Sequence, residues 1–135
     1  MAQSLRLRRE HWQAMERHVR AGAPLEACGL LAGRNDQVEQ VFLMQNAAQS
    51  PVRYRLDGLE QLRVFEAIEE AGLELVGIFH SHPQGPLFPS PIDVREAAYP
   101  VVYIIWAPVQ GEWTARGFRI EAGQITEVQL RVEEP

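Results

Sequence analysis

Two histidines separated by one residue follow an apolar run directly and are the strongest candidates for chemistry in this chain. His80 and His82 come after residues 75–79, and Asp93 lies a short distance further on. In a β-strand, residues two apart point to the same side, so both imidazoles can reach one ion. Ring nitrogens and a carboxylate oxygen suit a divalent metal, and three protein ligands leave a fourth tetrahedral position for water. The spacing therefore predicts a catalytic metal site formed by His80, His82 and Asp93.

The wider pattern around these residues resembles a known metalloprotease motif. His80-x-His82, seven further residues and then Ser90-x-x-Asp93 resemble the JAMM motif of the MPN-plus (Mov34/MPN/PAD-1) zinc metalloproteases. That family also carries a glutamate far upstream, and Glu26 in the segment PLEACGLLAG matches it. The resemblance is to the compact prokaryotic type and covers nearly the whole chain.

This resemblance implies a fold, a cofactor and a role for each residue. The fold would be a cytidine-deaminase-like MPN domain, and the cofactor one Zn²⁺ per chain with a catalytic water, held by His80, His82 and Asp93. Zinc would lower the pKa of that water towards ~7. Glu26 would accept its proton and pass it to the departing amine. The Ser90 hydroxyl would help zinc to stabilise the oxyanion of the tetrahedral intermediate.

The reaction implied is hydrolysis of an amide bond by a zinc metalloprotease or isopeptidase. Family members cleave peptide or isopeptide bonds after the tail of ubiquitin or ubiquitin-like proteins, and bacterial relatives process small sulfur-carrier proteins. The short loops at 45–51 and 81–89 leave no room for the long insertions of eukaryotic relatives. We therefore expect a small ubiquitin-like or sulfur-carrier partner with a Gly-Gly tail. Two alternatives are a general minimal metallopeptidase and a non-catalytic MPN scaffold, although scaffold relatives lack the ligands that this chain keeps.

The candidate residues also have purely structural interpretations. Ser90 and Asp93 have the spacing of a helix capping box, and a hydroxyl bonded to the backbone would not be free to face a substrate. Glu26 could be a surface residue at the start of a strand, and the two histidines could be hydrogen-bonded structural residues. Cys28 is expected to be a small core residue, since a thiolate nucleophile needs a base and electropositive surroundings.

Other zinc enzymes are excluded by the residues present. The chain has no H-E-x-x-H sequence, which removes the helix-borne zinc arrangement. Its single cysteine cannot supply the P-C-x-x-C pair of the nucleobase deaminases. His11 and His18 lie on a predicted helix about 10 Å apart along its axis, too far to share an ion. We expect them to be surface or helix-face histidines.

Length and composition limit the class of protein. With 135 residues, 46% of them hydrophobic, the chain can form one domain (1–135) with a proper core. A net charge of -5 without a basic cluster argues against nucleic acid or an anionic membrane surface as the main partner. No apolar run approaches a membrane span or a signal core, and a lone cysteine makes the cytoplasm the default location. Homo-oligomer formation is left open.

Hydrophobic periodicity predicts the elements that position these residues. We expect a helix over residues 10–21, a second that is capped by Asp57 and closes at Glu69, Glu70 and Gly72, and a third over residues 91–98 that is capped by Ser90. We expect strands over residues 4–8, 27–32, 38–44, 52–56, 73–79, 101–106, 113–120 and 125–132. Together they form an α+β (α/β) arrangement: a mixed, curved sheet with helices packed on it. Pro83, Pro86 and Pro89 stiffen the loop that leads to Asp93.

Overall fold

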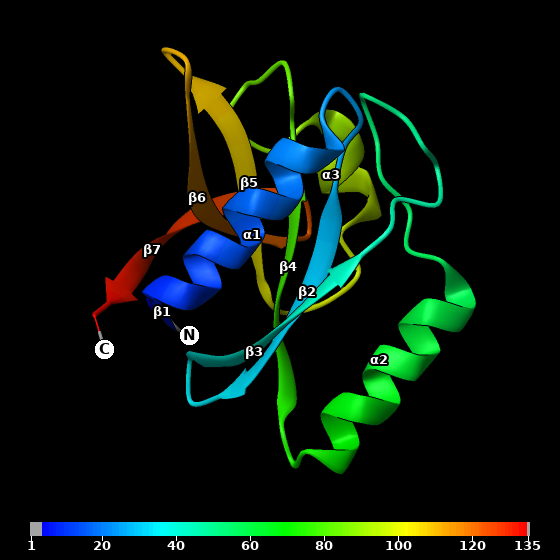
Figure 1. Ribbon diagram of the computed structural model, residues 1–135, viewed down its shortest axis with the longest axis vertical. Coiled ribbons are helices and arrows are strands. Elements are labelled where there is room, and N and C mark those ends of the chain that lie inside the picture. The colour runs from blue at the N-terminus through cyan, green and yellow to red at the C-terminus, as the bar shows by residue number, and fades with distance from the viewer. Residues whose placement is uncertain (1–3, 135) are drawn as a thin grey trace.

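The computed structural model describes residues 4–134 and consists mostly of strands (Figure 1). The strands are β1 (Ser4–Arg8), β2 (Cys28–Arg34), β3 (Gln37–Met44), β4 (Glu74–Ser81), β5 (Val102–Val109), β6 (Glu112–Glu121) and β7 (Gln124–Glu133). The helices are α1 (Arg9–Gly22), α2 (Gly58–Glu70) and α3 (Pro91–Glu96). Among the described residues, no helix has the length and apolar character needed to cross a membrane.

The sheet is mixed, as predicted, and it closes into a barrel. Its strand order is β1-β3-β2-β4-β5-β6-β7, and β1 then pairs with β7. β1 runs parallel to both of its neighbours and β4 runs parallel to β5, while the other pairs are antiparallel. Closure depends on β1, which pairs with β3 on one side and with the last strand, β7, on the other. The seam with β3 is the weaker one, because a single residue pair, Arg6 with Gln37, connects them.

Apolar side chains form a cluster on each face of the sheet. α1 lies across one face (Figure 1), where its Met15 and Val19 pack with Phe79 and Trp106. The other face packs Leu30, Ile78 and Tyr103 against residues of α2 and α3. Burying each large apolar side chain stabilises the fold by about 1.5–3 kcal/mol relative to exposure. β4 lies between the two clusters, so the strand that carries His80 is held on both sides.

A glycine permits the close contact between β2 and β4. Gly29 pairs with Phe79, and a Cβ at this position would lie 2.3 Å from both the Phe42 carbonyl oxygen and the Phe79 ring. A larger residue would therefore push the strands apart close to the histidines. We conclude that the small residue at position 29 belongs to the packing that positions β4.

One expectation about local structure is wrong. Residues 52–56 do not form a strand: the segment has only one isolated bridge, between Asn46 and Leu56. Of the two alternatives for His11, surface or helix face, the second holds: it lies on the buried face of α1, is 6% exposed, and its Nδ1 accepts the Arg8 backbone N–H at 3.1 Å. His18 lies on the packed face of the helix, where its Nε2 is 3.1 and 2.9 Å from two carbonyl oxygens of neighbouring strands.

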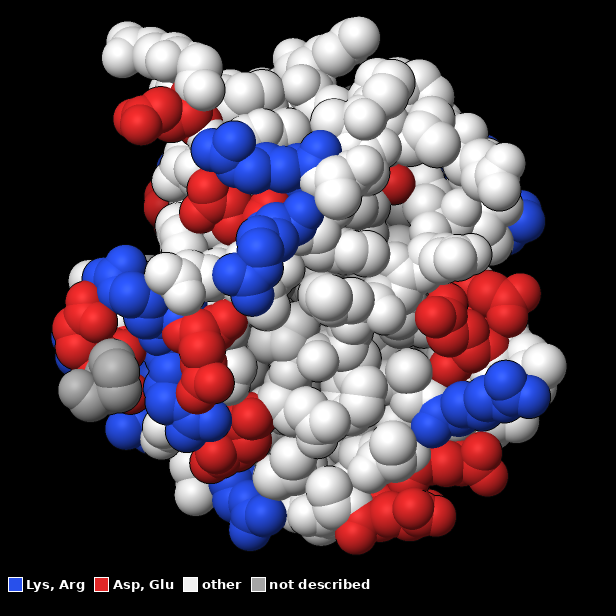
Figure 2. Space-filling view, viewed as in Figure 1, with Lys and Arg blue, Asp and Glu red and all other residues white. Residues whose placement is uncertain are grey.

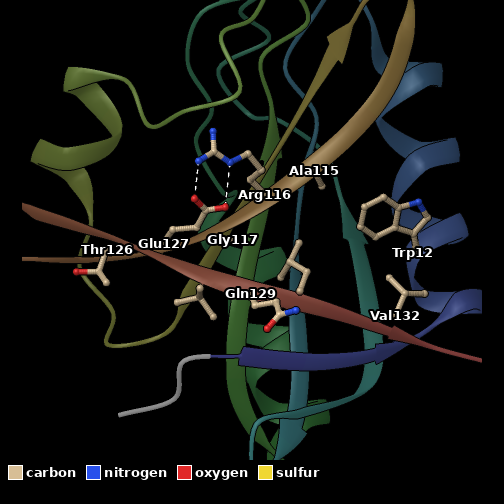
Figure 3. A pocket seen from close by; sticks show the side chains of 10 residues that line it. Trp12, Ala115, Arg116, Gly117, Thr126, Glu127, Gln129 and Val132 are labelled. Carbon is tan, nitrogen blue, oxygen red and sulfur yellow. Dashed lines mark hydrogen bonds and ion pairs between the residues drawn. The ribbon is translucent and has the colours of Figure 1, made fainter.

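The surface carries both signs of charge, and the face in Figure 2 shows acidic and basic side chains interspersed. A cavity of about 510 Å³ lies where β6 and β7 diverge. Trp12 and Val132 line it, and the ion pair between Arg116 and Glu127 stands at its side (Figure 3). None of the predicted site residues lines this cavity.

Candidate metal centre

The two histidines are delivered by the end of a central strand. β4 lies between β2 and β5, and His80 pairs with Cys28 on one side and Ile105 on the other. His82 follows the last strand residue, and its backbone N–H still donates to the Trp106 carbonyl at 2.7 Å. The alternation of the strand therefore continues through His82, which places both imidazoles on one side. The residues are 1% and 5% exposed.

Asp93 reaches the histidines from the first turn of α3. Its Oδ2 lies 3.1 Å from His80 Nε2 and 3.0 Å from His82 Nε2, and the two Nε2 atoms are 3.2 Å apart. Ligand atoms about 2.0–2.1 Å from a tetrahedral zinc are separated by about 3.3–3.4 Å. The three atoms thus form a triangle of nearly the size of one face of a zinc coordination tetrahedron, and the group could hold a metal ion.

The hydrogen bonds around His82 also favour a cation. His82 Nδ1 is 2.8 Å from the Pro86 carbonyl oxygen, which can only accept, so Nδ1 carries the proton. In neutral imidazole the other nitrogen, Nε2, is then a bare acceptor. This lone pair faces a carboxylate oxygen and a second imidazole nitrogen. Such an arrangement of electron pairs is favourable when a proton or a metal ion lies between them.

The pKa shifts describe the same buried cluster without a metal. Burial raises the pKa of Asp93, but the Ser90 N–H and hydrogen bonds from His80 and His82 in their protonated forms outweigh it and hold that pKa well below its usual range. Burial lowers the pKa of His80. Burial acts on His82 in the same direction, yet the bonds to Asp93 and the Pro86 carbonyl raise its pKa overall. Asp93 is therefore ionised, as a metal ligand should be.

Glu26 lies two residues before β2, and it is buried rather than on the surface. It is 3% exposed, and its backbone is held by the Ser50 carbonyl at 2.8 Å and the Asn46 amide at 3.0 Å. Its Oε1 has no hydrogen-bond partner among residues 4–134. Burial raises the pKa of Glu26 to about 8, and this carboxyl shares a pocket of about 180 Å³ with His82 and Ser90. A carboxyl with a pKa near neutrality suits proton transfer.

Ser90 is an N-cap, as one of the two interpretations predicted. Its Oγ accepts the Asp93 N–H at 3.0 Å, and Asp93 Oδ2 accepts the Ser90 N–H at 2.9 Å. The supposed conflict between capping and catalysis is wrong, because a hydroxyl that accepts one bond can still donate its own proton. The capping box also fixes the Asp93 carboxylate in position. The catalytic role of Ser90 remains a prediction.

Two residues near the histidines had no predicted role. The Tyr54 ring stacks on His80, with centroids 4.4 Å apart and planes at 22°. Asn46 hydrogen-bonds several backbone groups of the segment that carries Tyr54. The alternation of residues 52–56 was a signal that Tyr54 faces inward, but nothing in the sequence marked Asn46. Cys28 is buried as expected, and burial raises the pKa of its thiol to about 12, so it is no nucleophile.

Comparison with known proteins identifies the family. Residues 8–120 match the model of the prokaryotic homologues of the JAB domain. The chain belongs to this family. It is 39% identical over 125 residues to the CysO-cysteine peptidase of Mycobacterium tuberculosis, covering 90% of this chain and 86% of the relative. It is 42% identical over 108 residues to a probable TtuB-protein conjugate cleaving protease of Thermus thermophilus, covering 79% of this chain and 70% of that one.

Solved structures agree with the JAB assignment. A solution structure of a Desulfitobacterium hafniense protein matches with a TM-score of 0.87 and 33% identity, covering 97% of this chain and 94% of that one. A JAB1/MPN domain protein from Archaeoglobus fulgidus matches with a TM-score of 0.61 and 17% identity, covering 96% of this chain and all of the other (100%). The second likeness is informative about the fold alone. The expected resemblance to the JAMM/MPN-plus family is thus confirmed.

Proposed function

We propose that this JAB-domain chain is a zinc-dependent peptidase or isopeptidase that cleaves an amide bond at the C-terminal tail of a small ubiquitin-like or sulfur-carrier protein. The observation that carries the proposal is the triangle of His80, His82 and Asp93 beside a buried, unpartnered Glu26 carboxyl oxygen. The relatives named above are a peptidase and a conjugate-cleaving protease, which supports the same class of reaction.

The residues of the chain have separable roles in this mechanism. His80, His82 and Asp93 would hold Zn²⁺, which supplies a more acidic water and positive charge at the scissile carbonyl. The Glu26 carboxylate takes a proton from the attacking water and passes it to the departing amine, so the amine leaves in neutral form. A nearby cation lowers the pKa of Glu26 and makes it available as a base. Ser90 donates its O–H to the carbonyl oxygen as negative charge develops there.

The pocket beside the cluster supports a substrate with a slender tail. It is small, about 180 Å³, and Pro51, Val52 and Pro86 line it together with Glu26 and Ser90. A Gly-Gly tail has no side chains to accommodate in such a space, and its backbone can approach the catalytic groups closely. We infer that the partner is a compact β-grasp protein whose last two glycines occupy this pocket.

The decisive experiment compares the parent protein with Glu26→Gln, which keeps the size of the side chain and removes the base. A carrier protein is linked through its Gly-Gly tail to a lysine peptide, and single-turnover cleavage is followed at saturating enzyme with zinc content measured in parallel. We expect the parent to cleave and the variant to be ~10²–10⁴-fold slower with equal zinc. Equal rates would contradict the role of Glu26. Absence of cleavage by a zinc-loaded parent would favour the scaffold alternative.

A further inference from the structure

The two histidines differ in what holds their rings. His82 donates its Nδ1 proton to the Pro86 carbonyl at 2.8 Å. His80 Nδ1 is buried and has no hydrogen-bond partner among residues 4–134. A metal-binding histidine usually has its second nitrogen hydrogen-bonded, and this bond fixes the orientation of the ring. The His80 ring must therefore be oriented by something else.

Tyr54 supplies a flat contact on the His80 ring. The two ring centroids are 4.4 Å apart, and the planes are 22° from parallel, which is a stacked arrangement. A stacked neighbour resists tilting of the imidazole, because any tilt drives ring atoms into the phenol face. Tilting would also displace His80 Nε2 from its positions 3.1 Å from Asp93 Oδ2 and 3.2 Å from His82 Nε2. The stacking thus maintains the geometry of the ligand triangle.

The backbone on both sides of Tyr54 is held by one side chain. Asn46 Nδ2 donates to the Arg53 carbonyl at 2.9 Å, and Asn46 Oδ1 accepts the Arg55 N–H at 3.0 Å. These two groups belong to the peptide units immediately before and after Tyr54. The same Nδ2 also donates to the Glu26 carbonyl at 3.0 Å. Asn46 therefore fixes the irregular segment 52–56 and ties it to Glu26, two residues before β2.

We propose that Tyr54 is a positioning residue for the metal centre: held by Asn46, its ring orients His80 in place of the missing hydrogen bond at Nδ1. The inference rests on the proposed role of His80 as a zinc ligand and adds a residue outside the JAMM-like motif. The hydroxyl of Tyr54 is not required for this role. The flat ring is required, and this separates Tyr54→Phe from Tyr54→Leu.

The test is the zinc affinity of the protein, measured by competition with a chromophoric chelator at a temperature where circular dichroism shows every variant to be folded. We expect Tyr54→Phe to bind zinc as tightly as the parent. We expect Tyr54→Leu to bind zinc about 10–100-fold more weakly, the usual effect of losing the support of a metal ligand. Unchanged affinity in a folded Tyr54→Leu variant would overturn the proposal. If the leucine variant does not fold, Tyr54→Met fills the space with a flexible chain and carries the same expectation.

Tyr99→Leu is the matched control for the loss of an aromatic side chain. Tyr99 packs in the same apolar cluster as Tyr54, but its ring meets Phe65 edge-on at 6.2 Å and stacks on no histidine among residues 4–134. We expect this variant to melt at a lower temperature and to keep the zinc affinity of the parent. An equal loss of zinc affinity in both variants would mean a general loosening of the cluster and would overturn the proposal.

Asn46→Ala tests whether Asn46 holds Tyr54 in position against His80. We expect it to weaken zinc binding. The double variant with Tyr54→Leu should bind zinc no more weakly than Tyr54→Leu alone, because both substitutions abolish the same contact, that of the Tyr54 ring with His80. Additive losses would overturn the link between Asn46 and Tyr54. A parent protein that binds no zinc would instead overturn the metal centre itself, so the two failures are distinguishable.

Discussion

The candidate site has two halves that are built differently. His80 belongs to β4 and Glu26 lies two residues before β2, and together they form the sheet half; both are almost completely buried and have few hydrogen bonds from their side chains. His82, Ser90 and Asp93 belong to a loop and the first turn of α3, and backbone groups hold each of them. The sheet half is held by packing and the loop half by hydrogen bonds. Variants should therefore fail in different ways on the two sides.

The largest expected effect is the loss of the metal from the loop half. His82→Ala removes one of three ligands while leaving both core clusters intact, since His82 belongs to neither. We expect zinc content to fall from about one per chain to nearly none, and activity to be abolished. The melting temperature of the metal-free protein should change little. Elemental analysis and a thermal melt measure both, and full zinc retention would contradict the ligand assignment.

The sheet half should respond to pH, because burial raises the pKa of Glu26 to about 8. In the unfolded chain this pKa is about 4.3. Between these values the folded, metal-free protein keeps a proton that the unfolded chain has released. Its free energy of unfolding therefore falls as pH rises through this range. Glu26→Gln has no proton to lose, so near pH 8 we expect it to be more stable than the parent by on the order of 4 kcal/mol.

Denaturant unfolding of both metal-free proteins at pH 8 and near pH 4.5 measures this difference. Most of the advantage of Glu26→Gln should disappear at the lower pH, where the folded carboxyl is protonated and the unfolded one is only about half ionised. A constant difference at both pH values would show that the Glu26 carboxyl ionises normally. Asp93 and the histidines titrate in both proteins and therefore largely cancel in the comparison.

Ser90 should show a mixed effect, since its hydroxyl both caps α3 and is free to donate. Ser90→Ala removes the cap, which costs about 1 kcal/mol of stability. It also removes the proposed oxyanion donor, which should lower kcat by about 10²-fold or more. Ser90→Thr keeps both functions of the hydroxyl and is the control. If Ser90→Ala loses stability alone, the residue is only a cap.

The grouping of His80, His82 and Asp93 could be predicted from sequence because its geometry is largely local. Two residues at i and i+2 on a strand share a side, and a capping box places Asp93 on the first turn of a helix whatever the rest of the fold does. Barrel closure could not be predicted in this way. It depends on β1 pairing with β7, a contact between the two ends of the chain that has no local signal.

The segment 52–56 shows the limit of alternation as a signal. Tyr54 and Leu56 do pack inward, as the alternation of the sequence predicts. The strand prediction failed because side chains can alternate inward without a paired strand when another group forms the hydrogen bonds of the backbone. Here the Asn46 side chain bonds the peptide groups around Tyr54 and substitutes for a neighbouring strand. Such a substitution depends on the folded arrangement of the loop and leaves no periodic pattern.

The smallest expected effect separates this Asn46 anchor from a surface contact on the same segment. Arg53 also forms an ion pair with Glu96 of α3 at 3.0 Å, and both side chains are 49% exposed. A pair that solvent reaches so freely contributes about 0.2–1 kcal/mol at most and is screened by salt. We expect Arg53→Ala to lower stability by no more than about 0.5 kcal/mol at low ionic strength, with the difference shrinking in high salt.

Zinc affinity should not change, because Asn46 bonds the Arg53 carbonyl and not its side chain. Glu96→Gln removes the same pair from the other side and should match it. A marked loss of zinc affinity in either variant would show that the ion pair to α3, rather than Asn46, holds Tyr54 against His80.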